Sequence, residues 1–127
     1  MIRVNMSTLR AMVSESGHPW FSADTMRFFR SRVGQSAYAV DSGRVNHYFD
    51  PGYQVVYFVS SEQFRGMDGT QRPRRFTVRK ATLSFPTPET CAWHISTVGE
   101  FQEFASRSGA TARAKYLAQN GGDESNS

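Results

Sequence analysis

The fold class of this chain is decided by residues 53–61, which read YQVVYFVSS. Apolar side chains at positions 53, 55, 57 and 59 fall on one face of an extended strand, and Val56 and Phe58 fall on the other. Apolar residues on both faces are typical of a strand in the middle of a sheet. The stretch therefore predicts a central β-strand, and the rest of the chain must supply its neighbours.

Three further segments alternate in the same way and predict strands at residues 36–40, 74–83 and 92–98. Pro86 and Pro88 should end the second of them, because proline has no N–H to give to a strand ladder. In the last strand we expect Trp93 and Ile95 to face inward and His94 outward. Residues 62–72 carry two glycines and no periodicity, which predicts a mobile loop.

Helical patterns lie on both sides of these strands. Ser7 is a suitable N-cap for a helix over residues 7–16, and Ser22 for a second helix that ends at Gly34. A third helix is expected over residues 107–119, where the apolar side chains form one stripe: Ala110, Ala114, Leu117 and Ala118.

The segment between the last strand and the third helix has two interpretations. Thr97 and Glu100 have the spacing of a capping box, which would start a helix there. Alternatively, a strand resumes after a bulge at Gly99, and Ser106 caps the helix of residues 107–119. We favour the second interpretation because it keeps the apolar stripe continuous.

Together these elements predict an α+β fold. It consists of an antiparallel sheet of four or five strands packed by two N-terminal helices and one C-terminal helix. We expect a single domain over residues 1–119 and a disordered, polar and acidic tail over residues 120–127.

The amino-acid composition limits the cellular compartment and the kinds of partner that we expect for the protein. The 127 residues include 13% aromatic side chains, and the net charge is +4. The single cysteine, Cys91, excludes an intramolecular disulfide and a cysteine-based zinc site. No signal-peptide pattern or membrane span is apparent, so we expect a cytoplasmic protein. A basic chain favours an anionic partner, although ordinary surface charge is an equally open explanation.

The first candidate site is a set of basic residues on the second helix and the strand of residues 74–83. Arg75 and Arg79 are four apart and should point the same way, about 13 Å from each other. Such spacing suits successive phosphates, whereas pairing with nearby glutamates is the structural alternative. The full set is Arg27, Arg30, Arg72, Arg74, Arg75, Arg79 and Lys80.

The second candidate is a polar site formed by Ser60, Ser61 and Glu62 at the end of the central strand. A nucleophilic serine needs a base within reach, and no motif ties a histidine to these serines. The three histidines also lack paired metal-ligand spacing, so no metal and no cofactor is expected; they are His18, His47 and His94. Base stacking would require Tyr53 or Tyr57 to face solvent.

Three segments in this order resemble a group of small uncharacterised proteins carried by bacteriophages and plasmids. They are WFSADTMRFFRSR at residues 20–32, YFVSSEQF at 57–64 and RRFTVR at 74–79, and VGEFQEF at 98–104 fits the end of the pattern. Members often carry an acidic residue soon after the third segment, where this chain has Lys80-Ala81-Thr82. The resemblance implies a mobile-element origin and a host-cell setting, and it transfers no mechanism or catalytic residue.

These observations predict a non-catalytic accessory protein of a phage or mobile element. It would bind nucleic acid or a nucleoprotein complex in the host through a basic face. The alternative is a host-takeover or anti-defence inhibitor that binds a host protein or sequesters an anionic signalling nucleotide. An enzyme is a third class, and a homodimer is also left open.

Overall fold

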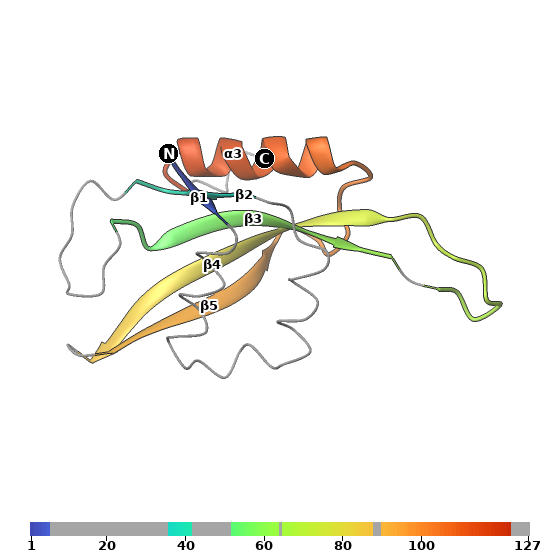
Figure 1. Cartoon of the computed structure of the whole chain (residues 1–127), viewed down its shortest axis with the longest axis horizontal. Coiled ribbons are helices and arrows are strands. Elements are labelled where there is room, and N and C mark those ends of the chain that lie inside the picture. The colour runs from blue at the N-terminus through green and yellow to red at the C-terminus, as the bar shows by residue number, and fades with distance from the viewer. Residues whose placement is uncertain (6–35, 42–51, 64, 88–89, 123–127) are drawn as a thin grey trace.

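A computed structural model of the chain describes residues 1–5, 36–41, 52–63, 65–87 and 90–122. These residues form one antiparallel sheet of five strands and a helix that lies across one face of it (Figure 1). Each strand pairs with the next in the chain, in the order β1 (Ile2–Asn5), β2 (Ser36–Ala39), β3 (Val55–Glu62), β4 (Arg75–Thr87) and β5 (Thr90–Val98). The helix is α3 (Arg107–Gln119).

The predicted central strand is confirmed, because β3 lies third of five strands and is buried on both faces. Tyr57 and Val59 point toward α3 and belong to the core cluster between helix and sheet. Val56 and Phe58 are buried on the opposite face, 0% and 1% exposed. The alternation read from the sequence therefore describes the two faces of the sheet.

The core between α3 and the sheet combines small helical residues with larger side chains on the strands. The predicted helical stripe of Ala110, Ala114, Leu117 and Ala118 is buried, as expected. Alanines let the helix approach β2, β3 and β4 closely. The sheet side of the cluster is filled by Tyr38, Tyr57, Val59, Phe76, Val78 and Val98.

Both ends of α3 are closed by local hydrogen bonds. The Ser106 hydroxyl accepts a hydrogen bond from the Gly109 N–H at 3.2 Å, which satisfies one of the free donors at the helix start. At the other end Gly121 adopts a φ of 67°, and the Gly122 N–H donates to the Leu117 carbonyl at 2.8 Å. A left-handed residue after the helix is the usual requirement for this closure, and glycine meets it without strain.

The interpretation of residues 97–105 as a strand resuming after a bulge is confirmed only in part: β5 ends at Val98, residues 99–103 form a loop, and pairing resumes at the single residue Phe104. Phe104 exchanges two backbone hydrogen bonds with Phe76, at 2.8 and 3.0 Å, after an interruption that starts at Gly99. Gly99 has a φ of 71°, and a side chain there would collide with the Glu103 carboxylate. The capping-box alternative is therefore wrong, and the chain enters α3 through the Ser106 cap instead.

Two sequence-based strand boundaries need correction. β4 continues through Pro86 to Thr87, and β5 begins at Thr90 instead of 92. A register shift between Ser84 and Thr87 accommodates the proline, since a bulge does not require every N–H to join the ladder. β1 was not predicted at all, although it has the same length as β2.

The predicted loop projects from the end of the β3–β4 hairpin, and we call its described residues, 63 and 65–74, the arm. Arg65 pairs with Gln71, and a turn follows in which the Gly66 N–H donates to the Thr70 carbonyl at 2.7 Å. The arm continues the β3–β4 hairpin away from the other elements (Figure 1). Glycines at positions 66 and 69 serve the turn, so they mark a tight hairpin end.

The described residues contain one helix, α3. The two predicted N-terminal helices, at residues 7–16 and 22–34, lie outside the described residues. No helix in the described part of the chain is long and apolar enough to cross a membrane.

Candidate functional site

Arg79 makes several contacts within the sheet. Its Nε donates to the Ser60 hydroxyl at 3.0 Å, and a terminal nitrogen donates to the Thr97 hydroxyl at 2.6 Å. The guanidinium also lies over the Phe101 ring, 5.4 Å from its centroid. Arg79 thus links β3, β4, β5 and the loop that follows β5, which is a structural role.

Arg75 fastens the loop of residues 99–103. Its Nε and one terminal nitrogen donate to the Gln102 and Glu103 carbonyls, each at 3.1 Å. Gln102 has a φ of 60°, which is unfavourable for a residue other than glycine, and its N–H donates to the Thr77 hydroxyl at 2.8 Å. Arg75 and Thr77 together hold this loop in place, so Arg75 is also engaged in the fold.

The predicted basic set therefore does not form one binding face. Strand alternation places Arg75 and Arg79 on the sheet face opposite α3, as their spacing predicted. Lys80 is on the α3 face, 5.9 Å from the centroid of the Tyr57 ring. Arg74 bridges the Ser61 hydroxyl and the Gln63 side-chain carbonyl, each at 3.1 Å. Arg27 and Arg30 lie outside the described residues.

The predicted polar site is divided by the sheet. Ser60 and Ser61 are adjacent in β3, so their hydroxyls point to opposite faces, and both residues are buried. Each hydroxyl accepts a hydrogen bond from an arginine, Arg79 and Arg74 respectively. The Glu62 side chain is not among those described. The two serines therefore cannot act as one hydroxyl pair.

His94 is not positioned to activate either serine. It is exposed, as predicted, and pairs with Thr82, whereas Ser60 pairs with Thr77. Five residues of β4 separate these positions, about 17 Å along the strand. His18 and His47 lie outside the described residues, among which no group of three or more metal-binding side chains occurs.

The aromatic strand does not offer a base-stacking surface. Tyr53 is 6% exposed and Tyr57 is 0% exposed, so the condition set for stacking is not met. Burial also raises the pKa of the Tyr53 hydroxyl. These rings belong to the interior of the protein, which corrects the stacking hypothesis.

The arm carries exposed cationic side chains. Arg65, Arg72 and Arg74 are exposed, and the only acidic residue of the arm is Asp68. Within the described residues, no hydrogen bond or ion pair engages the guanidinium of Arg65 or Arg72. Arg72 belongs to the predicted set. Arg65 was missed because the segment was interpreted as an aperiodic loop.

One flank of α3 carries a second group of cations that the sequence analysis did not select. We call Arg107 and Lys115, which line the same hollow, the basic helix surface. The charged groups of Arg107 and Lys115 lie over the rings of Phe76 and Tyr38, 5.8 and 5.4 Å from the centroids. Such packing holds the aliphatic stems against the sheet while both residues remain exposed.

The composition of α3 contains a signal that could have identified this surface. Residues 107–119 include three cations and no acid. Arg107 occupies the first helical position, where the helix dipole disfavours a positive charge. An open hollow on this helix is lined by Arg107, Ser108, Thr111, Ala112 and Lys115.

The basic helix surface and the arm meet at β4. Arg107 lies over Phe76, and the arm leaves the sheet immediately before that residue, at Arg74 and Arg75. The fold and this surface define a small α+β protein with a basic helix and a projecting basic arm. The chain belongs to the family of unknown function DUF7447, whose sequence pattern matches residues 5–115. No curated protein matches the chain. No solved structure matches it either.

Proposed function

We propose that this protein is a non-catalytic binding protein that contacts nucleic acid or a nucleoprotein complex. The contact surface of this proposal is the basic helix surface, and the arm lies beside it. The observation that carries the proposal is the exposure of Arg107 and Lys115 on a helix that has no acidic residue. This differs from the face predicted from the sequence, because Arg75 and Arg79 are bound within the fold.

Geometry supports a phosphate ligand at α3. Arg107 and Lys115 are eight residues apart, which corresponds to about 12 Å along the helix. Ser108 and Thr111 line the hollow beside them and add hydroxyl donors. Positive charges with neighbouring hydroxyls are the groups that position a nucleic-acid backbone without reading its sequence.

Placement of a cation at the start of a helix also favours a functional explanation. Arg107 at the first position of α3 costs about 0.3–1 kcal/mol through the helix dipole. Residues that oppose a local stability rule are expected at functional sites. An anionic partner at Arg107 would remove this penalty in the complex.

The setting that we propose is the cytoplasm of a bacterial host, with a phage or other mobile element as the origin. The resemblance of residues 20–32, 57–64 and 74–79 to proteins of such elements supports this setting. The family assignment agrees with an uncharacterised group and is neutral as to origin.

The test is fluorescence anisotropy of labelled single-stranded and duplex DNA with the purified protein at several salt concentrations. We expect affinity to fall steeply with salt, because phosphate contacts release counterions. The variant Arg107→Gln/Lys115→Gln should weaken binding to both forms and reduce the salt slope by about two. The matched control, Arg107→Lys/Lys115→Arg, keeps both charges and should bind as the wild type does. No binding by the wild type at low salt would refute the proposal.

A host protein is the second candidate partner, and the exposed apolar side chains favour it. Met67 is 108% exposed, and Phe101 and Tyr116 are 50% and 39% exposed. Methionine and aromatic residues are enriched at protein interfaces. A tagged pull-down from lysate with and without nuclease separates the candidates, since only a protein partner of this kind survives nuclease.

A further inference from the structure

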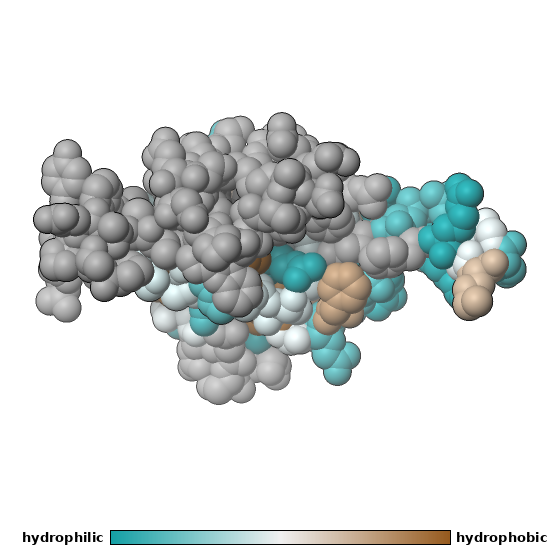
Figure 2. All heavy atoms as spheres, turned by 90° about the horizontal axis from the view of Figure 1, so that it is seen from below, coloured by the Kyte–Doolittle hydropathy of each residue, from teal (hydrophilic) through white to brown (hydrophobic). Residues whose placement is uncertain are grey.

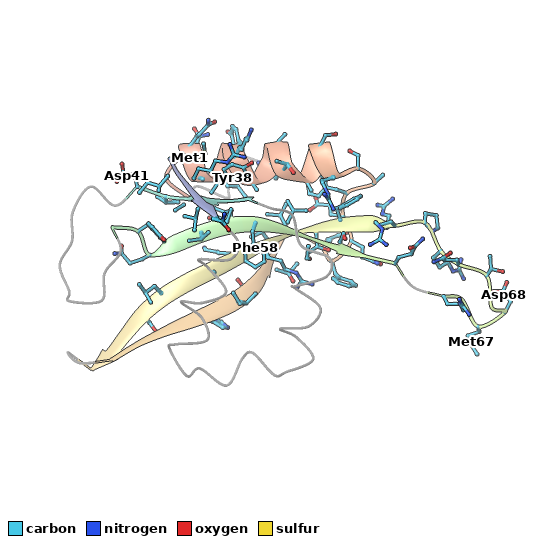
Figure 3. The ribbon with its side chains drawn as sticks, viewed as in Figure 1. Met1, Tyr38, Asp41, Phe58, Met67 and Asp68 are labelled. Atoms are coloured by element: carbon cyan, nitrogen blue, oxygen red, sulfur yellow. The ribbon has the colours of Figure 1, made fainter. Side chains whose placement is uncertain are left out.

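The arm ends in a fully exposed methionine. Met67 and Asp68 lie at the tip, at the point farthest from α3 and the sheet (Figure 3). In the space-filling view the arm is hydrophilic except for a hydrophobic patch at its end (Figure 2). Because it is fully exposed, the Met67 side chain adds nothing to the stability of the isolated chain and is available for contact with a partner.

Hydrogen bonds shape the arm before any partner binds. At the tip the Thr70 N–H donates to the Asp68 carboxylate at 2.9 Å, and the Gly69 N–H donates to the Gly66 carbonyl at 2.9 Å. At the base the Gln63 amide donates to the Arg72 carbonyl at 3.1 Å. A preformed projection loses less conformational entropy on binding than a flexible loop does.

The arm is long enough to reach the floor of a groove of nucleic acid. The tip lies five residues beyond the last pair of the sheet, Glu62 with Arg75, which corresponds to at most about 17 Å. The major groove of B-form DNA is about 12 Å wide and 8.5 Å deep and accepts a two-stranded β-ribbon. β-Ribbons can also enter the minor groove, about 6 Å wide, but the negative potential of a narrow minor groove disfavours the Asp68 carboxylate at the tip. The major groove of A-form RNA is deep and narrow.

The charges on the arm favour its entry into a groove of nucleic acid. Arg65 precedes the turn of the arm and Arg72 follows it, next to the single bridge of Arg65 with Gln71, and both are exposed. Residues 63–74 hold three arginines and one aspartate, a net charge of +2. The single carboxylate is at the tip, where it would meet base edges and not phosphates, and cytosine N4 is a donor there.

We infer that the arm enters the major groove of B-form DNA, with Arg65 and Arg72 on the phosphates of the two walls and Met67 against the base edges. This inference rests on the proposed function, because it names the nucleic acid and the groove that the basic surface serves. The basic helix surface then contacts the backbone beside the groove, since α3 begins next to the base of the arm.

The experiment measures anisotropy with a 20-base-pair DNA duplex, the corresponding single strand and an RNA duplex. The variant Arg65→Gln/Arg72→Gln should weaken duplex DNA binding about tenfold and lower its salt slope by about two. Binding to the single strand should be unchanged. Arg65→Lys/Arg72→Lys is the charge-matched control, and circular dichroism checks that each variant is folded.

Groove-specific competitors provide a second readout on the wild type. Methyl green, which occupies the major groove, should displace the protein, and distamycin, which occupies the minor groove, should not. Met67→Ala should weaken duplex binding without changing the salt slope, because it removes an apolar contact only.

The outcomes separate this inference from the proposed function. Displacement by distamycin alone, or arm variants that bind duplex DNA as the wild type does, would overturn the arm inference. The proposed function would still stand if Arg107→Gln/Lys115→Gln weakens binding in the same assay. A wild type that binds none of the three nucleic acids would overturn both.

Discussion

The Nε of Arg79 lies 3.0 Å from the hydroxyl of Ser60, a residue with no exposed surface. In the sequence these two residues belong to separate candidate sites, one basic and one polar. In the structure they form a single contact between β4 and β3, and Arg74 with Ser61 forms a second one on the other face. The packing of this hairpin therefore engages two arginines of the basic set and both serines of the polar set.

Replacement of Arg79 should destabilise the protein. Arg79→Met keeps much of the aliphatic stem and removes the charged donor to buried Ser60, so we expect a loss of about 1–3 kcal/mol in the free energy of unfolding. Urea denaturation followed by circular dichroism measures it. A double-mutant cycle with Ser60→Ala isolates the contact. Unchanged stability together with lost nucleic-acid binding would show that Arg79 is a binding residue.

Truncation of the main helical anchor should have the largest effect on stability. Leu117 is 0% exposed in the core between α3 and the sheet. Leu117→Ala should therefore cost about 2–5 kcal/mol, through lost burial and a cavity. Gln119→Ala, two residues along on the exposed side, should stay within about 0.5 kcal/mol of the wild type. Equal effects of the two variants would contradict the packing of α3.

The end of α3 depends on a left-handed backbone at Gly121. Its φ of 67° disfavours a side chain, so Gly121→Ala should cost about 1 kcal/mol or more. Asparagine tolerates this conformation better than alanine, so Gly121→Asn should cost less. Thermal unfolding of the three proteins gives the order, and an alanine variant as stable as the wild type would contradict the closure at Gly122.

The turn at the tip of the arm should respond to acid. The hydrogen bond from the Thr70 N–H lowers the pKa of the Asp68 carboxyl below its ordinary value. The ionised carboxylate therefore favours the turn above the unfolded pKa, and this contribution disappears as pH falls through the lower folded pKa. The Thr70 amide shift, followed by NMR, should titrate with a midpoint below that of an ordinary aspartate. Asp68→Asn should remove this titration, and a midpoint at the ordinary value would contradict the hydrogen bond.

Much of the fold was predictable, because the local periodicity of apolar residues indicates strands and helices. The alternation of residues 53–61 identified the central strand and both of its faces, and the stripe on residues 107–119 identified α3 and its buried side. Two features were missed: β1, and the single pair of Arg65 with Gln71 that holds the arm beyond the continuous ladder and leaves no periodic signal.

The candidate site was less predictable, because exposed and engaged arginines look alike in a sequence. Arg72, Arg74, Arg75 and Arg79 fall within eight residues, yet two of them hold the loop after β5 and the serine of β3. The basic helix surface was not predicted, because only the apolar stripe of residues 107–119 was used to interpret that segment.

The sequence by itself determined the central strand β3, the helix α3 and which of their faces are buried, because backbone geometry imposes a period of two or 3.6 on such elements. Only the tertiary structure decided which cations are available to a partner. That depends on the carbonyls and hydroxyls brought within reach by strand register, such as Gln102 beside Arg75 and Ser60 beside Arg79. These partners are 27 and 19 residues away in the chain, and no local pattern records them.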